Sequence, residues 1–334
     1  MKFKICVVGC GQLANSHHGP AYVKYAQENP NTELAACCDV VEQKAADFSR
    51  RFGFLRHYTD PVRMLDTEHP DAVCLLVPPA ITAGLACEIL TMKYPLMMEK
   101  PPGLTVDQTD QMIEAARRSG TPNQVAFNRR YTPLVAFVKN LLLENVAAGD
   151  LQHLQYDFHR IRRIDDDFST SAIHGIDATR FLAGSDYACV SYHYQDLPAL
   201  GPTAANIFLD CTFESGATAQ ISFCPVSGAV IERVTIHTLD QLFFLNIPIW
   251  NAFDAPGSVV HVRKGVIVGK YAGPEISAGA EDFILSGFYA ENAQFFNDIR
   301  SGRAPRGNIE SGRQSVEIAQ FIREKRTSYS RGAL

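Results

Sequence analysis

The chain has 334 residues, which is long for one ordinary domain, and 46 % of them are apolar, which is enough for two hydrophobic cores. Its formal charge of −5 comes from interspersed acids and bases, so neither nucleic acid nor an anionic membrane is an expected partner. The longest apolar stretch, 72–87, is broken by Pro78 and Pro79 and is short for a bilayer span, which predicts no transmembrane segment.

The N-terminal stretch MKFKICVVG has too short an apolar region for a signal peptide, and we interpret it as a first strand. The nine cysteines form no C-x-x-C pair, and most of them lie in apolar runs. This usage predicts reduced, buried thiols and a cytoplasmic protein.

The first third of the chain alternates strands with helices. Short, nearly continuous apolar runs, typical of parallel strands buried on both faces, occur at 3–8, 33–38, 72–77 and 94–98. Helical patterns occur at 15–28, 41–52, 80–92 and 105–120, the last with Thr105 as its N-cap and Gly120 as its stop. This order predicts an α/β domain with a parallel sheet over residues 1–123.

The rest of the chain follows a different pattern. From about 151 to 268 apolar and polar residues alternate with a period of two, and Glu214-Ser215-Gly216 is typical of a hairpin turn. A helix over 168–183 interrupts these strands, and helical patterns at 288–300 and 310–325 follow them. We expect a second, α+β domain over 124–334, built on a large, mostly antiparallel open sheet.

A glycine-rich turn follows the first predicted strand. Gly9 permits a tight turn, Gly11 lets a pyrophosphate approach the backbone, and Ala14 lets helix and strand pack closely, as in a dinucleotide fingerprint. Asp39 ends the second strand, where its carboxylate can bind ribose hydroxyls and repel a 2'-phosphate. The pattern predicts a Rossmann domain that binds NAD, with NADP less favoured; the alternative is a glycine turn and a helix-capping aspartate without a ligand.

Lys100 follows the fourth strand in the sequence MEKPP. Open parallel sheets bind ligands at this carboxyl edge, so we expect a functional lysine there rather than a solvated turn.

Six segments together resemble the Gfo/Idh/MocA family of glucose-fructose oxidoreductases and inositol dehydrogenases: GCGQLA, the aspartate of CCDV, YTDP, DAVCLLVPP, MEKPPGLT and FNRRYTP. The resemblance implies a Rossmann domain followed by a sheet domain whose open face holds the substrate. It implies that Lys100 contacts substrate and cofactor where hydride is transferred, and that Gln12, Leu13, Pro78 and Glu99 join Gly9, Gly11, Ala14, Asp39 and Lys100 in binding the cofactor.

The predicted helix at 168–183 resembles the family's substrate motif, in which an aspartate precedes a histidine by four residues and a second aspartate follows it by three. His174 and Asp177 match the last two positions, and Thr170 stands at the first. These residues share one helix face. Alcohol oxidation needs a base that titrates near neutrality, and His174 is our candidate.

Two assignments in this motif stay open. Thr170 cannot stabilise an imidazolium by charge, and one of Asp165, Asp166 and Asp167 could replace the missing acid, although three acids before a helix are more typical of a solvated N-terminal cap. Asp177 either contacts substrate or His174, or pairs with an arginine such as Arg180.

Five residues are candidates for substrate binding. The Thr170 hydroxyl can position a substrate, and Arg129 and Tyr131 lie in a segment that borders the active site in relatives. Arg160 and Arg162 end the strand YDFHRIRR together with His159 and Arg163. This cationic cluster favours an anionic or strongly hydrogen-bonding substrate, or else forms a solvated sheet edge. The histidines and acids show no compact ligand spacing, so we expect no metal.

We therefore expect a cytoplasmic, NAD-preferring oxidoreductase that acts on a sugar, polyol or sugar derivative. Two alternatives remain: a redox-neutral enzyme that oxidises a sugar transiently, and a non-catalytic dinucleotide- or sugar-binding regulator. The resemblance also implies a homodimer or homotetramer formed through the sheet of the second domain.

Overall fold

The computed structural model describes residues 2–147, 149–250, 252–277 and 279–332. The chain forms two compact units, Met1–Asn128 with Phe288–Val316, and Arg129–Gly287 with Glu317–Leu334. No helix over the described residues has the length and apolar character needed to cross a bilayer. All nine cysteine thiols are free; six are buried, Cys87 and Cys224 are half-buried, and Cys189 is exposed.

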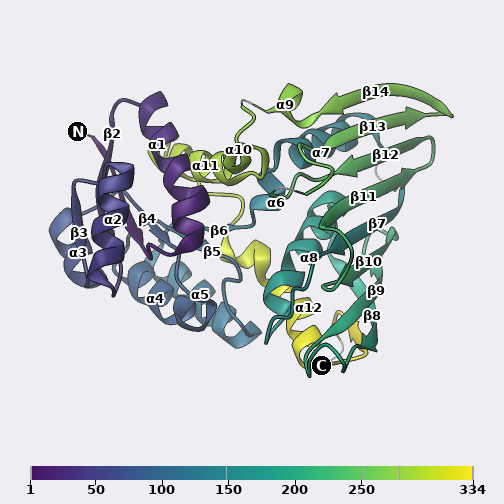
Figure 1. Cartoon of the computed structure of the whole chain (residues 1–334), viewed down its shortest axis with the longest axis horizontal. Coiled ribbons are helices and arrows are strands. Elements are labelled where there is room, and N and C mark those ends of the chain that lie inside the picture. Colours follow the sequence, from purple (N-terminus) through teal and green to yellow (C-terminus); the bar gives the residue numbers. More distant parts are fainter. Residues whose placement is uncertain (1, 148, 251, 278, 333–334) are drawn as a thin grey trace. The chain divides into compact units, whose positions relative to one another are not determined.

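The first unit contains a six-stranded, fully parallel sheet in the order β3-β2-β1-β4-β5-β6. Its strands are β1 (Phe3–Val8), β2 (Thr32–Cys38), β3 (Arg56–Tyr58), β4 (Ala72–Leu75), β5 (Leu96–Glu99) and β6 (Asn123–Ala126). The central strands β4 and β5 are buried along their whole length, because helices cover both faces of the sheet (Figure 1). The predicted parallel α/β domain is confirmed.

The helices of this unit are η1 (Ala14–His18), α1 (Gly19–Glu28), α2 (Glu42–Phe52), α3 (Pro61–Glu68), α4 (Pro79–Thr91), α5 (Val106–Ser119) and α11 (Phe288–Arg300). The predicted ends of α5 are confirmed: the Thr105 hydroxyl accepts a hydrogen bond from the Gln108 amide at 3.2 Å, and Gly120 is left-handed with φ of 68°. The element η1 is a π-helix, which the sequence pattern did not predict.

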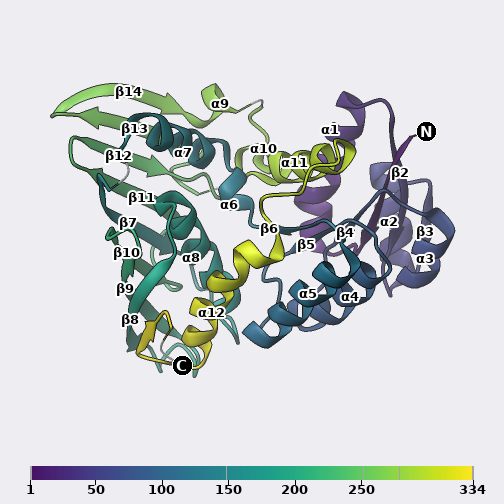
Figure 2. The same cartoon turned by 180° about the vertical axis from the view of Figure 1, so that it is seen from behind.

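Helix α11, which comes after the whole second-unit sheet except β15 in the sequence, packs in the first unit, beside α1 in both views (Figures 1 and 2). Its Phe295 and Phe296 are fully buried in one core with Tyr22, Tyr25 and Phe48. The prediction of two consecutive domains with a boundary at residue 123 therefore differs from the compact units. The reason is that these two phenylalanines complete the N-terminal core.

The second unit contains a nine-stranded sheet in the order β14-β13-β12-β11-β7-β10-β9-β8-β15. Its strands are β7 (Leu151–His159), β8 (Tyr187–Asp196), β9 (Ala205–Phe213), β10 (Thr218–Cys224), β11 (Ile231–Thr238), β12 (Gln241–Asn246), β13 (Ser258–Arg263), β14 (Val266–Ala272) and β15 (Ser328–Ser330). β7 and β10 pair in parallel and the other neighbours pair antiparallel, which confirms the predicted sheet.

The helices of this unit are α7 (Pro133–Asn145), α8 (Ser169–Ala183), α9 (Gly273–Ile276) and α10 (Asp282–Leu285). Two further helices, α6 (Asn128–Tyr131) and α12 (Ile309–Arg323), begin in the first unit and end in this one. Helix α8 packs closely on the sheet through Gly175, where a Cβ would lie 2.9 Å from the ring of Phe223 and 3.4 Å from that of Tyr156. The side chains of α8 are thereby held at fixed positions over β7 and β10.

Candidate active site

The glycine turn after β1 has the geometry of a dinucleotide-binding loop. Gly9 has φ of +100°, and a Cβ there would lie 2.2 Å from the Leu76 carbonyl oxygen, so only glycine fits. A Cβ on Gly11 would meet no protein atom within 4 Å. The backbone at Gly11 is therefore open to a large group, as a pyrophosphate requires.

Asp39 contacts this loop directly. Its Oδ2 accepts a hydrogen bond from the Cys10 amide at 3.0 Å, and its Oδ1 accepts one from the Val41 amide at 2.9 Å. Each oxygen has a further lone pair, so the carboxylate can also accept bonds from ribose hydroxyls. The next side chain, Val40, is 86 % exposed and carries no charge.

The predicted cofactor residues lie at one edge of the parallel sheet. Strands β1, β4 and β5 are parallel neighbours, so their carboxyl ends lead into the glycine loop, Pro78 and Lys100 at the same edge. Gln12 and Pro78 are exposed, whereas Leu13 and Lys100 are half-buried. These positions fit NAD: the loop offers open backbone for the pyrophosphate, and the edge carries the lysine.

Glu99, which precedes Lys100, has a partner that the sequence interpretation missed. The Nε2 atom of His18 lies 2.8 Å from Glu99 Oε1, and His18 is fully buried. The π-helix η1 turns both His17 and His18 into the core. The available signal was the glutamate itself, because a carboxylate at the end of a buried strand needs a hydrogen-bond donor.

His18 and Glu99 also belong to a group that could hold a cation. The ligand atoms of His18, Glu99 and Glu291 lie within 4.8 Å of one another, and all three residues are buried. Both ring nitrogens of His18 already have hydrogen-bond partners. The expectation that the protein needs no metal stays a prediction.

In the second unit, α8 presents Thr170, His174 and Asp177. The helix begins where Asp167 Oδ1 accepts a hydrogen bond from the Ser169 amide at 3.0 Å, and it ends at left-handed Gly184, with φ of 67°. His174 is half-buried. The Thr170 hydroxyl donates to the Asp167 carbonyl at 3.0 Å, a bond back to the preceding turn.

The three acids before α8 have different surroundings. Asp167 accepts the Ser169 amide bond described above, but the N-cap residue of α8 is Phe168, without a side-chain cap. Asp165 Oδ2 accepts hydrogen bonds from Arg163 and Ser171, each at 2.9 Å, and Asp166 is exposed. Two of the three carboxylates therefore bond to the N-terminal turn of α8, although neither occupies the N-cap position.

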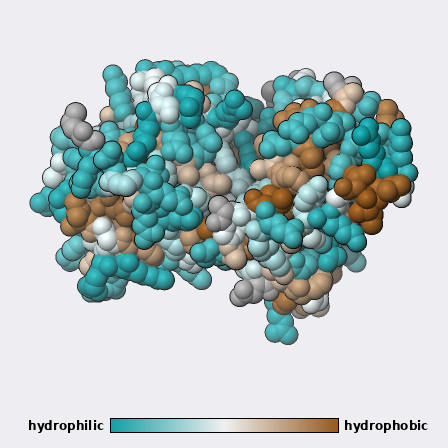
Figure 3. Space-filling view, turned by 90° about the horizontal axis from the view of Figure 1, so that it is seen from above, coloured by the Kyte–Doolittle hydropathy of each residue, from teal (hydrophilic) through white to brown (hydrophobic). Residues whose placement is uncertain are grey.

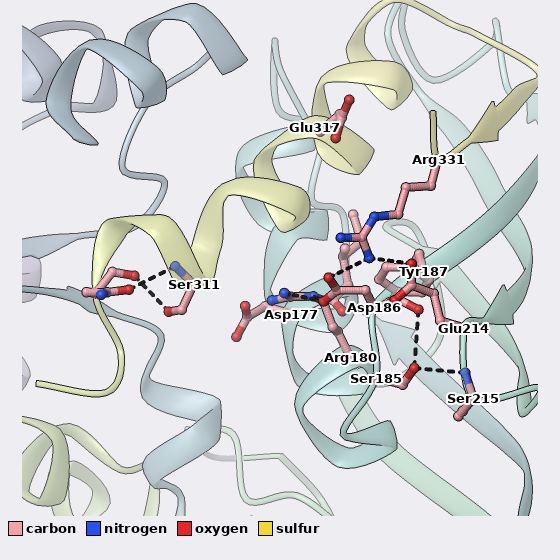
Figure 4. A network of polar contacts seen from close by, with 12 residues as sticks. Asp177, Arg180, Ser185, Asp186, Tyr187, Glu214, Ser215, Ser311, Glu317 and Arg331 are labelled. Atoms are coloured by element: carbon pink, nitrogen blue, oxygen red, sulfur yellow. Dashed lines mark hydrogen bonds and ion pairs between the residues drawn. The ribbon is translucent and has the colours of Figure 1, made fainter. Parts of the chain in front are cut away.

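Asp177 is paired with an arginine, but not with the one suggested by the sequence. Arg130 donates from Nε to Asp177 Oδ2 at 2.7 Å and from Nη2 to Oδ1 at 2.5 Å. Arg180 turns to Asp186 at the end of α8, where Arg331 also donates to the same carboxylate (Figure 4).

Two of the five predicted substrate-binding side chains share a buried carboxylate. Arg129 donates to both oxygens of Glu232, at 2.9 and 3.0 Å, and Arg160 Nη2 donates to Oε2 at 2.5 Å. Arg160 continues the inward face of β7, after Tyr156 and Phe158, so it is not part of a solvated sheet edge. Arg162 is exposed and Tyr131 is half-buried.

Glu232 is fully buried, and the sequence interpretation missed it. Burial alone would raise the pKa of this carboxyl, but the charges and hydrogen bonds of Arg129 and Arg160, with a hydrogen bond from Tyr156, lower the pKa to about 2. Glu232 is therefore charged at neutral pH. The available signal was an acidic residue at an inward-facing position of the alternating strand 231–238, because a buried carboxylate needs a cationic partner.

Comparison with known proteins identifies the class. Residues 3–127 match the family described as "Oxidoreductase family, NAD-binding Rossmann fold", GFO_IDH_MocA. This confirms the resemblance noted from the sequence for the N-terminal domain: residues 3–127 form an NAD-binding Rossmann domain of the Gfo/Idh/MocA oxidoreductase family.

Oxidoreductase P35 of Formosa agariphila is 29 % identical over 140 residues, which is 42 % of this chain and 42 % of that protein. The scyllo-inositol 2-dehydrogenase (NAD(+)) of Bacillus subtilis is 22 % identical over 326 residues, covering 90 % of this chain and 87 % of the relative. A solved levoglucosan dehydrogenase, in complex with NADH and levoglucosan, has a TM-score of 0.84 at 19 % identity and covers 99 % of both chains. The likeness to levoglucosan dehydrogenase shows a common fold. The chain matches less than half of the length of Oxidoreductase P35.

Proposed function

We propose that the protein is a dehydrogenase that transfers hydride between nicotinamide and a hydroxyl-bearing carbon of a sugar, polyol or sugar derivative. The observation that carries this proposal is the open backbone at Gly11, with Asp39 bonded to the same loop and Lys100 at the same sheet edge. Relatives named as inositol and levoglucosan dehydrogenases support the substrate class.

In this proposal bound NAD supplies the hydride acceptor, and the side chains of this chain manage the proton and the charge. The Lys100 ammonium donates a hydrogen bond to the reacting oxygen and stabilises the negative charge that develops there. Neutral His174 accepts the hydroxyl proton as the carbon loses its hydride. Asp177, three residues along α8, has both oxygens bonded to Arg130, so it holds the helix and is not the proton acceptor.

We propose NAD as the preferred cofactor. The Asp39 carboxylate would repel the 2'-phosphate of NADP, and Val40 offers no positive charge in compensation. In Asp39→Asn we expect the affinity for NADH to fall about tenfold and the ratio of NADPH to NADH affinity to rise, because a ribose contact and a repulsion are both lost. Fluorescence titration with both cofactors measures this, and an unchanged ratio would contradict the preference.

The central experiment follows nicotinamide absorbance with NAD and a panel of inositols, aldoses, anhydrosugars, uronic acids and amino sugars. Reduction of NAD that is lost in both Lys100→Met and His174→Ala supports the proposal and the two roles. Arg263→Met, which changes an exposed cation of β13 paired with Asp240, is the matched control for a lost charge and should turn over normally.

The other outcomes point to the alternatives. NAD that stays bound without net reduction, together with conversion of a sugar, would favour the redox-neutral enzyme. Binding of NAD and sugar without conversion would favour the regulator, and absence of NAD binding would overturn the proposal.

We also propose that the second unit mediates homo-oligomer formation. Phe208 of β9 and Phe244 of β12 are 36 % and 44 % exposed on the sheet, and β14 exposes Val266, Ile267 and Val268. Figure 3 shows apolar side chains gathered at the end of the sheet where β13 and β14 lie. Light scattering should give a dimer or tetramer, and Phe244→Asp should lower its mass; a monomeric wild type would contradict this.

A further inference from the structure

His18 connects three elements of the first unit. It ends the π-helix that follows the glycine loop, it lies against the ring of Phe288 at the start of α11, and it contacts Glu99 at the end of β5. The side chain is fully buried, and Glu99 retains 8 % of its exposure. A buried histidine of this kind must satisfy both ring nitrogens within the protein.

The bonds of His18 determine where its proton lies. Asn292 Nδ2 is 2.7 Å from the Phe288 carbonyl oxygen and 3.0 Å from His18 Nδ1. A carbonyl only accepts, so the amide group of Asn292 must direct its NH₂ towards both atoms. The Nδ1 atom of His18 then accepts a hydrogen bond and carries no proton, which makes the ring neutral with its single N–H at Nε2.

That N–H donates to Glu99 and fixes one of its oxygens. The Oε1 atom accepts from His18 Nε2 at 2.8 Å, and Oε2 accepts from the backbone N–H of Lys100 at 3.1 Å. The carboxylate therefore bridges the buried imidazole and the peptide of Lys100. Without the His18 bond the carboxylate of Glu99 would keep only the bond from the Lys100 N–H, and the buried carboxylate of Glu291 lies beside it.

We propose that His18 is a positioning residue for Lys100: as the neutral Nε2–H tautomer it orients Glu99, and Glu99 holds the backbone from which the Lys100 side chain extends. The network runs from Asn292 through His18 and Glu99 to Lys100, and every member lies in the first unit. It links the helix that begins at the cofactor loop to the turn that carries the lysine. The inference rests on the proposed function in so far as Lys100 acts on the substrate.

Two amide variants test the contact. In His18→Gln the longer amide reaches the position of Nε2 and can donate to Glu99, whereas in His18→Asn the amide occupies the position of Nδ1 and cannot. Tyr25→Phe is the control, because it removes one partly buried hydrogen bond between α1 and α11, to Asn297 at 2.9 Å, without touching Glu99.

We expect His18→Asn to lower kcat about tenfold or more at saturating substrate and cofactor, since a displaced catalytic group loses rate without losing binding. The Kd for NADH should change less than about threefold, and His18→Gln and Tyr25→Phe should keep kcat within about threefold. Equal kcat in His18→Asn and Tyr25→Phe at comparable thermal midpoints would overturn the inference. So would an equal loss in His18→Gln and His18→Asn.

Two further measurements need no substrate. In ¹⁵N-histidine-labelled protein, long-range ¹H–¹⁵N spectra of wild type should show His18 neutral and protonated at Nε2, with the peak assigned by its loss in His18→Gln; a proton at Nδ1 would overturn the inference.

The rate of Lys100 acylation by acetic anhydride, followed by peptide mass spectrometry, should change in His18→Asn and not in Tyr25→Phe. If both results appear but no sugar is oxidised, the proposed function fails and the positioning role stands.

Discussion

Arg130 of α6 and Asp177 of α8 form an ion pair with two hydrogen bonds, and their side chains are 11 % and 1 % exposed. The pair joins the segment that enters the second unit to the helix that carries His174. Because both carboxylate oxygens are bonded to the guanidinium, the pair fixes the position of Asp177, which lies three residues after His174 on α8.

Replacing Asp177 by asparagine should destabilise the protein strongly. The change leaves a buried guanidinium without its counter-charge, which costs about 3–5 kcal/mol of unfolding free energy. The double change Arg130→Met with Asp177→Leu should recover most of this loss. Denaturant unfolding measures each value, and Asp240→Asn, which breaks the exposed pair with Arg263, is the control and should cost less than about 1 kcal/mol. Equal losses in the two single variants would show that the buried pair contributes no more than a surface pair.

Glu232 should make stability depend on acid pH. Its pKa in the folded protein is about 2, below its usual value of 4.5, so the unfolded chain binds the proton more tightly. The stabilisation is complete above pH 4.5 and is lost as the pH falls towards 2. Between pH 6 and pH 3 this group alone should remove about 2 kcal/mol of unfolding free energy.

The measurement is denaturant unfolding of wild type and Glu232→Gln from pH 6 to pH 3. The variant is less stable at neutral pH because two buried arginines lose their partner, but its stability should fall less steeply with acid. Parallel curves for the two proteins would assign the acid sensitivity to other carboxyls.

Gly9→Ala and Gly11→Ala should fail in different ways. At Gly9 the new methyl group would collide with the Leu76 carbonyl at a positive φ, so we expect the free energy of unfolding to fall by about 3 kcal/mol or more, or no folded protein.

At Gly11 the methyl group meets no protein atom, so the thermal midpoint should stay within about 2 °C of wild type. The affinity of Gly11→Ala for NADH should nevertheless fall at least about tenfold, because the methyl group occupies the space of the pyrophosphate. Unchanged NADH binding in Gly11→Ala would place the cofactor elsewhere.

Thr170→Asp should alter the pH dependence of turnover. A carboxylate one helical turn before His174 favours the imidazolium form, so the acidic limb of the kcat/KM profile should move to higher pH. At pH values below this limb we expect kcat/KM to fall about twofold, because the interaction energy of an exposed i,i+4 charge pair on a helix corresponds to a factor of this size. Thr170→Asn is the isosteric control. If the two variants have superimposable profiles, His174 is not the base that the limb reports.

Local signals predicted the first unit well. The glycine turn, Asp39 and the strand before Lys100 follow from short-range patterns, and the Thr105 cap and Gly120 stop appear where expected. The three-residue strand β3 was missed because its side chains are mostly exposed and show no apolar run. The packing of α11 in the first unit could not be predicted from the local sequence. Phe295 and Phe296 have the pattern of an ordinary apolar helix face, which does not show which domain they pack against.

The site was predicted unevenly for the same reason. His174 and Asp177 lie on one helix and can be found from their spacing. Arg129 and Arg160 looked like substrate ligands because Glu232, their partner, lies 103 and 72 residues away along the chain. Likewise the role of His18 could not be predicted, because its partner Glu99 lies 81 residues later in the chain. The π-helix that turns His18 into the core is not indicated by any residue propensity.

The burial of α11 in the N-terminal core has a consequence for biosynthesis. Phe296 packs on Tyr22 and Tyr25, Phe295 lies in the same core, and Gly312 lies against the ring of Phe127, so the first unit lacks part of its core until these segments exist. A nascent chain on the ribosome has made the whole parallel sheet, and residues 129–287 of the other unit, before it can bury those aromatic rings. The N-terminal domain, although domains made first usually fold first during translation, therefore cannot complete its core until residues 288–312 have been made.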